Sequence, residues 1–334
     1  MKPIACALAS DTLVHVSRYA LESVERAMVQ AGMTGCRTPI RSLTMQRAVR
    51  YLYRVGVARR LLPLQRMAML VPMMGLQEHL LFPWALTREV VPVVFDCLPN
   101  EFAQWQRLFQ RTGVNTAFFT ASAAAAHFRQ VMPEGRWHWL PEAINLADYS
   151  AAMPWADRPI QVLEFGRRYD KYHDAVADGL AAAGARHVYE RRKGELVFAS
   201  QADFLVGLGQ AQVSICFPQS LTHPERFGNI ETLTQRYLES MASGCVLLGK
   251  APGELIDLCG YNPVLDVDWA APVTQLMAIQ AEPQLHAELR ARNIDFVRKR
   301  GTWELRAIEL VQKLATSDFK PTIQANPARL KERS

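Results

Sequence analysis

Two glutamates and an arginine lie close together in the second half of the chain. Glu231 and Glu239 are separated by seven residues, and Arg236 lies between them. An ionised carboxylate accepts two hydrogen bonds in a fixed geometry, which suits the hydroxyls of a ribose or a sugar. A guanidinium offers forked donors to phosphate oxygens. These residue types in this spacing suit the binding of a nucleotide.

The residues around this group predict a loop, a helix and a strand. Apolar residues recur at helical spacing, which predicts a helix over residues 231–243 that Gly244 can end. Cys245 to Leu248 has the composition of a buried strand, and Val213 to Phe217 has it upstream. Arg236 and both glutamates therefore follow the carboxyl end of a strand, where open α/β sheets bind ligands.

These segments resemble the nucleotide-sugar-dependent glycosyltransferases of the GT-B fold, in the "glycosyl transferases group 1" class. The Glu, seven residues, Glu pattern around Arg236, the Ala-Ser-Gly helix end at 242–244 and the hydrophobic strand after it carry the match. Ile160 to Arg168 is similar to the strand that opens the donor domain of that class, and Thr302-Trp-Glu-Leu-Arg306 is similar to its Thr-Trp-x-x-Arg helix. The resemblance covers residues 140–315, and the N-terminal third only by general layout.

The resemblance implies a nucleoside-diphosphate sugar as donor, with no cofactor and no metal. Without a metal, cations of the protein must neutralise the charge that develops on the leaving diphosphate. Gly166 follows a predicted strand and permits close backbone approach to phosphate. Arg167 is the first candidate for the diphosphate, and Arg168 or Lys171 is its candidate partner, although a surface arginine pair after a strand fits the same pattern.

The resemblance also assigns roles within the second group of residues. Glu239 is the expected ribose ligand, and Glu231 is expected nearer the donor sugar, with a catalytic role. Gly228 would let the backbone of 226–230 approach the diphosphate. Arg236 either binds the diphosphate or pairs with one of the glutamates. Both glutamates could instead face solvent on the helix, where Glu231 would favour the positive N-terminal dipole.

A base near the acceptor hydroxyl would help the transfer, because that hydroxyl loses its proton. Asp96 is the candidate, since it follows the apolar strand Val90 to Phe95 and should project from the first domain toward the second. His15, His173 and His223 are alternatives, but a single histidine is more often a surface or core residue than a catalyst.

Two motifs resemble nucleotide sites without fitting one. Asp266-Val-Asp268 has the D-x-D pattern of the other major glycosyltransferase fold, whose carboxylates hold a divalent cation. It comes after the predicted nucleotide-binding unit, so we do not expect it to bind the donor. Gly207-Leu-Gly209 is a fragment of a dinucleotide fingerprint, but it precedes a strand and lacks the third glycine, which favours a loop or a helix end.

The length of 334 residues predicts two domains, at about 100 to 200 residues each. Residues 1–150 are expected to form an acceptor-binding Rossmann-like domain and residues 151–318 a nucleotide-sugar-binding one, with a polar tail over 319–334. Pro141-Glu-Ala-Ile-Asn145 resembles the connection between GT-B domains, and 148–159 is a linker candidate. The fold class is therefore α/β, with two Rossmann-like domains facing across a cleft.

Apolar runs separated by helical stretches predict the strands of both sheets. The expected strands are Ile4–Ala9, Met67–Val71, Val90–Phe95, Thr116–Thr120, Trp137–Leu140, Gln161–Phe165, His187–Glu190, Val213–Phe217 and Cys245–Leu248. The segment from Pro283 to Ala315 is expected to be helical. The part from Trp303 to Leu314 is a candidate for the helix that crosses back to the first domain.

The charge distribution has one unusual region. The net charge is +6, and no acidic residue occurs between Arg26 and Gln77. Arg47, Arg50 and Arg54 recur at helical spacing among apolar residues, which predicts a basic amphipathic helix that either contacts anionic lipid or faces solvent and the acceptor cleft. No nucleic-acid-binding module accompanies the charge, so nucleic acid is not an expected partner.

Composition and cysteine positions argue against a membrane-spanning protein and against a metal site formed by cysteines. No segment has the ~18 to 20 apolar residues that a membrane-spanning helix needs, and the N-terminus lacks the apolar core of a signal peptide. The six cysteines are scattered and form no Cys-x-x-Cys or Cys/His cluster, which favours buried thiols and predicts no metal site. A cytoplasmic protein is expected, and the basic helix leaves open a peripheral position at the inner face of the membrane.

The predicted function is metal-independent transfer of a sugar to a cell-surface glycan or a lipid-linked acceptor. The paired glutamates favour retention of the anomeric configuration, by analogy with the class. Two alternatives remain open. One is epimerisation of a nucleotide sugar on the same fold, and the other is a non-catalytic basic protein that binds glycan or membrane.

Overall fold

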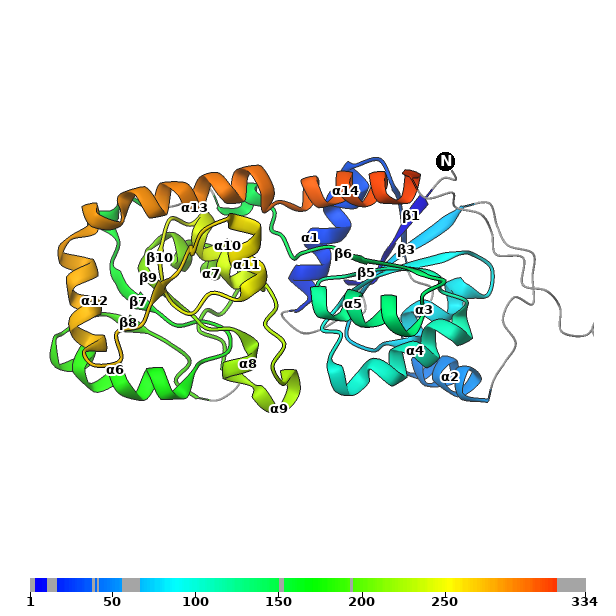
Figure 1. Ribbon diagram of the computed structural model, residues 1–334, viewed down its shortest axis with the longest axis horizontal. Helices are drawn as coiled ribbons and strands as arrows, with labels where there is room; N and C mark the ends of the chain where they lie inside the picture. Colours follow the sequence, from blue (N-terminus) through cyan, green and yellow to red (C-terminus); the bar gives the residue numbers. More distant parts are fainter. Residues whose placement is uncertain are drawn as a thin grey trace, which may run out of the picture.

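The computed structural model describes residues 4–10, 17–37, 40, 42–55, 67–149, 153–192 and 195–316. These residues form two parallel sheets side by side, and helices cover the faces of each sheet (Figure 1). In the described part of the chain, the strands of the first sheet end at residue 139 and those of the second begin at residue 160.

The first sheet has the strand order β2-β1-β3-β4-β5-β6, and all its pairings are parallel. Its strands are β1 (Ile4–Leu8), β2 (Thr34–Arg37), β3 (Ala68–Met74), β4 (Val90–Phe95), β5 (Thr116–Phe119) and β6 (Arg136–Trp139). The helices between them are α1 (Ser17–Gln30), α2 (Leu43–Arg54), α3 (Glu78–Ala85), α4 (Phe102–Thr112) and α5 (Ser122–Val131). β3 and β4 are buried almost throughout, as a central parallel strand covered on both faces must be.

The second sheet has the order β11-β10-β9-β7-β8, again all parallel. Its strands are β7 (Ile160–Leu163), β8 (His187–Val188), β9 (Ala211–Cys216), β10 (Val246–Gly249) and β11 (Leu265–Asp266). Its helices are α6 (Asp170–Ala182), α7 (Gln201–Gly209), α8 (Gln219–Thr222), α9 (Pro224–Phe227), α10 (Gln235–Ala242), α11 (Gly253–Cys259), α12 (Pro272–Ala281) and α13 (Ala287–Arg300). Short 3₁₀ turns are η2 (Pro99–Glu101), η3 (Leu146–Tyr149), η4 (Trp155–Asp157) and η5 (Pro283–His286).

In both sheets, the second strand lies on one side of the first strand and the third strand lies on the other, so the strand order reverses there. This reversal lies between β1 and β3 in the first sheet and between β7 and β9 in the second. Ligands of doubly wound sheets bind at such a point, outside the carboxyl ends of the strands. The topology thus marks the loop after β7 and the segment after β9 as positions for a ligand.

The chain crosses back to the first sheet at its C-terminal end, as the sequence predicted. α13 lies over the second half of the molecule and α14 (Trp303–Thr316) over the first (Figure 1). Trp303 is fully buried in the core of the first half, with its ring 5.8 Å from that of Phe95. A parallel bridge between Ile144 and Thr302 joins the two segments that connect the halves. Two crossings limit how freely the halves can move apart.

Several sequence-based boundaries differ from the structure. The edge strand β2 was missed, because its sequence Thr-Gly-Cys-Arg has no apolar run and three of its four residues are exposed. The helix expected over 231–243 begins only at Gln235. The linker candidate 148–159 contains the end of η3 and the whole of η4, while residues 150–152 lie outside the described part of the chain. The predicted tail over 319–334 also lies outside it.

The cysteines largely follow the expectation of buried thiols. All six cysteines are free thiols, and four of them are buried. None of the helices in the described part of the chain has the length and apolar composition that crossing a bilayer requires.

Candidate active site between the two sheets

A cleft of about 1360 Å³ lies between the two halves, at the carboxyl ends of strands from both sheets. The first half contributes Asp96 after β4 and Glu142 after β6. The second half contributes Arg167 after β7, and Arg236 and Glu239 from α10. The cleft therefore lies where the strand order reverses in the second sheet, which is the position that the topology marks for a ligand.

Gly166 and Arg236 fit together at the end of β7. Gly166 has a φ of +69°, a region that favours glycine, and a Cβ there would lie 2.5 Å from Arg236 Nη2. Arg236 Nη1 donates a hydrogen bond to the Arg167 carbonyl over 2.9 Å, and its guanidinium lies 5.6 Å from the centre of the Phe165 ring. The missing side chain of Gly166 thus makes room for a guanidinium, where the sequence analysis expected room for phosphate.

Arg167 belongs to a group of cations that face one another. Its guanidinium lies 5.0 Å above the Phe227 ring, and Arg226 lies 5.5 Å from the same ring. Burial lowers the pKa of Arg167, Asp96 opposes this effect, and the positive charge of Arg236 adds to it. Because arginine stays protonated in proteins, this group is a concentration of positive charge that an anion would stabilise.

Glu239 is held at the same cleft by a tyrosine from the segment that connects the halves. The Tyr149 hydroxyl donates a hydrogen bond to Glu239 Oε1 over 2.9 Å. Burial raises the pKa of the Glu239 carboxyl to about 7, although Tyr149 and the nearby Arg236 oppose this rise. Among the described residues, no ion pair joins Arg236 to either Glu231 or Glu239. Glu239 is half-buried and bonded to Tyr149, so its carboxylate is not on a freely solvated helix face.

Glu231 does not lie where the sequence analysis expected it. It precedes α10, so it occupies no helix position, and its Oε1 pairs with Lys250 Nζ at 2.6 Å. Neither Glu231 nor Gly228 lines the cleft. Gly228 has a φ of +55° and is exposed, with open space where a Cβ would be. Glu231 is thus paired with Lys250 outside the lining of the cleft, and its approach to the donor sugar stays a prediction.

The two cations proposed as partners of Arg167 are already engaged. Arg168 pairs with Asp170 at 2.8 Å and donates to the Glu190 carbonyl, at the edge of the cleft. Lys171 lies 4.7 Å from the centre of the Trp269 ring and does not line the cleft. Arg236 therefore lines the cleft near enough to Arg167 for their charges to interact.

Asp96 projects into the cleft, as expected. It is the one non-glycine residue with a positive φ in the described part of the chain, at +50°, a conformation that aspartate tolerates better than most residues. It also lines a small pocket that Gln219, Phe227 and Thr232 of the second half help to form. The loop after β4 thus aims its carboxylate across the boundary between the halves.

Glu142 is a cleft residue that the sequence analysis did not select. Its Oε2 accepts a hydrogen bond from the backbone N–H of Gln235 over 2.9 Å, at the start of α10. Burial and the nearby charge of Asp96 raise the pKa of Glu142 to about 8. The sequence did indicate a position at the cleft for Glu142, because this residue follows strand β6 within the Pro-Glu-Ala-Ile-Asn segment that resembles a domain connection.

A second glutamate bridges the halves beside the cleft. Glu254 Oε1 accepts from the backbone of Ser122 over 2.7 Å, and its Oε2 accepts from the backbone of Leu233 over 2.8 Å. Both bonds are charge-assisted and partly shielded from water, so they fix the segment before α10 against α5. Nothing in the local sequence around residue 254 indicated this role.

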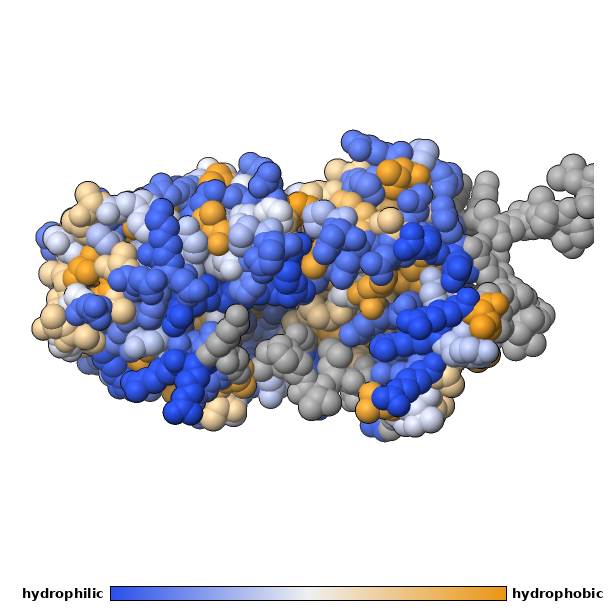
Figure 2. Space-filling model, turned by 90° about the horizontal axis from the view of Figure 1, so that it is seen from below, coloured by the Kyte–Doolittle hydropathy of each residue, from blue (hydrophilic) through white to orange (hydrophobic). Residues whose placement is uncertain are grey.

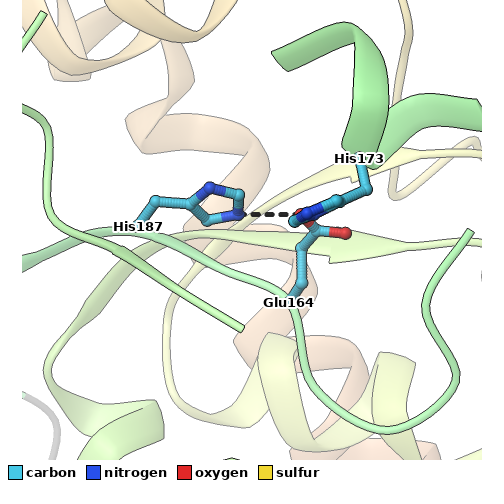
Figure 3. Close-up of side chains that lie close together, drawn as sticks. All are labelled: Glu164, His173 and His187. Atoms are coloured by element: carbon cyan, nitrogen blue, oxygen red, sulfur yellow. Dashed lines mark hydrogen bonds and ion pairs between the residues drawn. The ribbon is translucent and has the colours of Figure 1, made fainter. Parts of the chain in front are cut away.

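The histidines considered as bases have other surroundings. His173 and His187 both bond to Glu164 Oε1, and Figure 3 shows the two imidazoles on either side of that carboxylate. His223 lines the cleft next to Thr222, while His15 lies outside the described residues. Burial acts to raise the pKa of Glu164, but the hydrogen bonds from both histidines outweigh it and the net pKa is lowered.

The two motifs set aside in the sequence lie away from the cleft. Asp268 Oδ1 accepts from the backbone of Ala270, and neither Asp266 nor Asp268 lines the cleft. Gly207 and Gly209 belong to the last turn of α7, which agrees with the expected loop or helix end.

Solved structures share this architecture over nearly the whole chain. HepE from Anabaena, in complex with UDP and glucose, is 10% identical with a TM-score of 0.57, and the match covers 94% of this chain and 100% of that chain. Sucrose-phosphate synthase from Thermosynechococcus elongatus is 14% identical with a TM-score of 0.57, over 95% and 99%. A glycosyltransferase from Rickettsia africae is 10% identical with a TM-score of 0.54, over 94% and 98%.

This chain has the GT-B fold. The predicted fold class, two Rossmann-like units facing across a cleft, is thereby confirmed. No protein-family model and no curated protein matches the sequence. At identities of 9 to 14%, likeness to these structures establishes the GT-B architecture, and the chemistry has to be argued from the cleft itself.

Proposed function

We propose that this GT-B protein transfers a sugar from a nucleoside-diphosphate donor to an acceptor hydroxyl. The observation that carries the proposal is the convergence of Arg167, Arg236 and Glu239 on one side of the cleft, opposite Asp96 and Glu142. The neighbours support the same class of donor, because HepE was solved with UDP-glucose and an α-glucosyltransferase with UDP-glucose and DNA.

In this proposal, the protein itself supplies the positive charge for the diphosphate. Arg167 and Arg236 stand at the carboxyl end of β7, where their guanidinium groups would bind the phosphate oxygens and stabilise the leaving group. Charge neutralisation by arginine is the reason for assigning a metal-independent transfer. Glu239 binds the ribose hydroxyls through its carboxylate, and Tyr149 holds that carboxylate in place.

The acceptor side of the reaction belongs to the first half. Asp96 accepts the proton that the acceptor hydroxyl loses, since its carboxylate enters the cleft from the strand end opposite Arg167. Glu142, with its raised pKa, is a neutral neighbour of Asp96 at neutral pH, so it limits repulsion at that carboxylate. We assign retention of the anomeric configuration, by analogy with the class, which requires the acceptor hydroxyl to attack from the same face of the sugar that the diphosphate leaves. Proton NMR of the first-formed product tests it.

The acceptor proposed is a cell-surface glycan or a lipid-linked glycan at the cytosolic face of a membrane. α2 supports the membrane contact, because it exposes Arg47, Arg50 and Arg54 together with apolar side chains. The exposed fractions are 71% for Leu43, 47% for Met45, 65% for Tyr51 and 42% for Leu52. Figure 2 views the molecule from the side on which α2 lies in Figure 1, and there hydrophobic residues form separate spots among hydrophilic ones.

Co-sedimentation with vesicles tests the membrane contact. Each arginine near an anionic surface contributes about 1 kcal/mol, so binding should require phosphatidylglycerol in the vesicle and should weaken with salt. The double variant Arg47→Gln, Arg54→Gln should bind at least tenfold more weakly. Arg298→Gln, Lys299→Gln on α13 removes the same charge elsewhere and should bind like the wild type.

Saturation-transfer NMR against UDP-, GDP- and dTDP-sugars, followed by incubation of the bound donor with candidate acceptors, tests the main proposal. Binding of one donor class that Glu239→Ala abolishes, with a glycosylated product, supports sugar transfer. An isomer of the donor formed without any acceptor would indicate epimerisation. Vesicle binding with no nucleotide affinity would indicate a non-catalytic membrane protein.

A further inference from the structure

A carboxylate and two imidazoles converge where β7, β8 and α6 meet, outside the cleft. His173 Nδ1 lies 2.8 Å and His187 Nε2 lies 2.7 Å from the same atom, Glu164 Oε1. All three potential ligand atoms lie within 4.8 Å of one another. Figure 3 shows both rings directed at the carboxylate, with their nitrogens toward it.

The three side chains come from three different elements, so the fold and not the local sequence brings them together. Glu164 follows β7, His173 lies on α6 and His187 lies on β8. Their side chains are 3%, 10% and 6% exposed, respectively. Tyr189 packs against both imidazoles, with its ring centre 4.6 Å from each. The group is therefore shielded and held on several sides.

Two imidazole nitrogens and one carboxylate oxygen form a ligand set that suits zinc. Zinc binds histidine nitrogen and carboxylate oxygen at about 2.0 to 2.2 Å, and sites with three protein ligands keep a fourth position for water. Neighbouring ligands of a tetrahedral ion at these distances are about 3.4 Å apart, so each imidazole would have to move outward by about 0.6 Å. Rotation of a side chain supplies a movement of this size without a change in the backbone.

The group is distinct from the donor site proposed above. None of its three residues lines the cleft, whereas the residues that directly follow Glu164 do. Gly166 and Arg167 are two and three positions further along the chain. An ion bound at Glu164 would therefore fix the end of β7 and the loop that carries Arg167, without contact to a bound diphosphate.

We propose that Glu164, His173 and His187 together bind one divalent transition-metal ion of the zinc type, with water as the fourth ligand. The proposal rests on the geometry of this group and is independent of the reaction assigned to the cleft. It also does not change the metal-independent character of that reaction, because the ion lies outside the cleft.

Calorimetric titration of the untagged, chelator-treated protein with Zn²⁺ tests the proposal. One ion per chain is expected for the wild type. Glu164→Gln keeps the shape of the side chain, and His187→Phe keeps a ring against Tyr189, but each removes a ligand and should weaken Zn²⁺ binding at least tenfold. His138→Gln is the control, since His138 is a partly buried, ring-stacked histidine in the other half of the molecule. It should bind Zn²⁺ like the wild type.

X-ray absorption spectroscopy of the zinc-loaded wild type identifies the ligand atoms of the ion directly. It therefore tests the proposal even if a variant does not fold. Nitrogen and oxygen ligands at about 2.0 to 2.1 Å, with an imidazole signature, support the proposal. A sulfur shell at about 2.3 Å would place the ion on cysteines and overturn it. Absence of Zn²⁺ binding by the wild type, or equal affinity in wild type, Glu164→Gln and His187→Phe, would also overturn it.

Discussion

Tyr149 donates its phenolic hydrogen to Glu239 Oε1 over 2.9 Å. Tyr149 belongs to η3, in the segment that leads from the first sheet to the second, and Glu239 lies on α10. The contact therefore ties the proposed ribose ligand to the connection between the halves. Any movement of one half relative to the other would also move the tyrosine that orients this carboxylate.

Tyr149→Phe should weaken nucleoside-diphosphate affinity and shift its pH dependence. A hydrogen bond to a charged group contributes about 1.5 kcal/mol or more, so we expect a loss of about tenfold. Donor affinity should fall as the pH drops through about 7, because protonation removes the carboxylate that accepts from ribose. Tyr149 helps to lower that pKa, so in the variant the midpoint should lie at a higher pH. Calorimetry from about pH 6 to about pH 9 measures both effects, and an unchanged midpoint would contradict the assignment.

Arg167→Ala and Arg168→Ala should differ sharply in nucleoside-diphosphate affinity, although the residues are neighbours. Arg167 faces Arg236 in the cleft, and its loss should weaken binding about tenfold to a hundredfold. Arg168 is already paired with Asp170, so its loss should change affinity by less than about threefold. Fluorescence or calorimetric titration of both variants measures the difference. Equal losses of affinity in the two variants would show that the loss comes from any change in this loop, and not from a contact of Arg167 with the diphosphate.

The sequence predicted the alternation of strands and helices, because central parallel strands are continuous apolar runs and the helices carry an apolar face. It missed β2 and β11, which are short edge strands with little apolar character. It also placed Glu231 in a helix, since the apolar pattern that begins at Leu233 belongs partly to the segment that packs against the second core.

The candidate site was predictable where its residues directly follow a strand, as Asp96 and Arg167 do. Long-range partners were not predictable, because they depend on how the two halves meet. Glu142 reaches the start of α10 across 93 positions, and the Glu164, His173 and His187 group spans three elements with no metal-ligand spacing in the sequence. The sequence analysis likewise expected Gly166 to leave room for phosphate. The residue that fills this room is Arg236, which lies 70 positions further along the chain.

Gly166→Ala should reduce both stability and donor affinity, whereas Gly184→Ala should reduce stability alone. Both glycines have nearly the same φ, +69° and +68°, so alanine costs about 1 kcal/mol or more at either position. Only at Gly166 would the new Cβ meet Arg236, at 2.5 Å, and displace it from the Arg167 carbonyl. Thermal unfolding combined with nucleotide titration separates the two effects. Wild-type affinity in Gly166→Ala would exclude a role for the position of Arg236.

Glu142→Gln should stabilise the protein, and more so at higher pH. The folded-state pKa of about 8 lies above the usual value for glutamate, so the folded state holds its proton between about pH 4.5 and pH 8 while the unfolded state releases it. The stability of the wild type therefore falls across this window as the pH rises. Glutamine mimics the protonated group and can still accept from the Gln235 N–H.

The melting temperatures of Glu142→Gln and the wild type should therefore be similar near pH 5 and should differ by about 2 °C or more at pH 8. Glu134→Gln, at an exposed position between α5 and β6, is the matched control and should show no difference that grows with pH. Scanning calorimetry at both pH values measures the comparison. A stabilisation by Glu142→Gln that is the same at both values would mean that the carboxyl is not protonated in the folded protein.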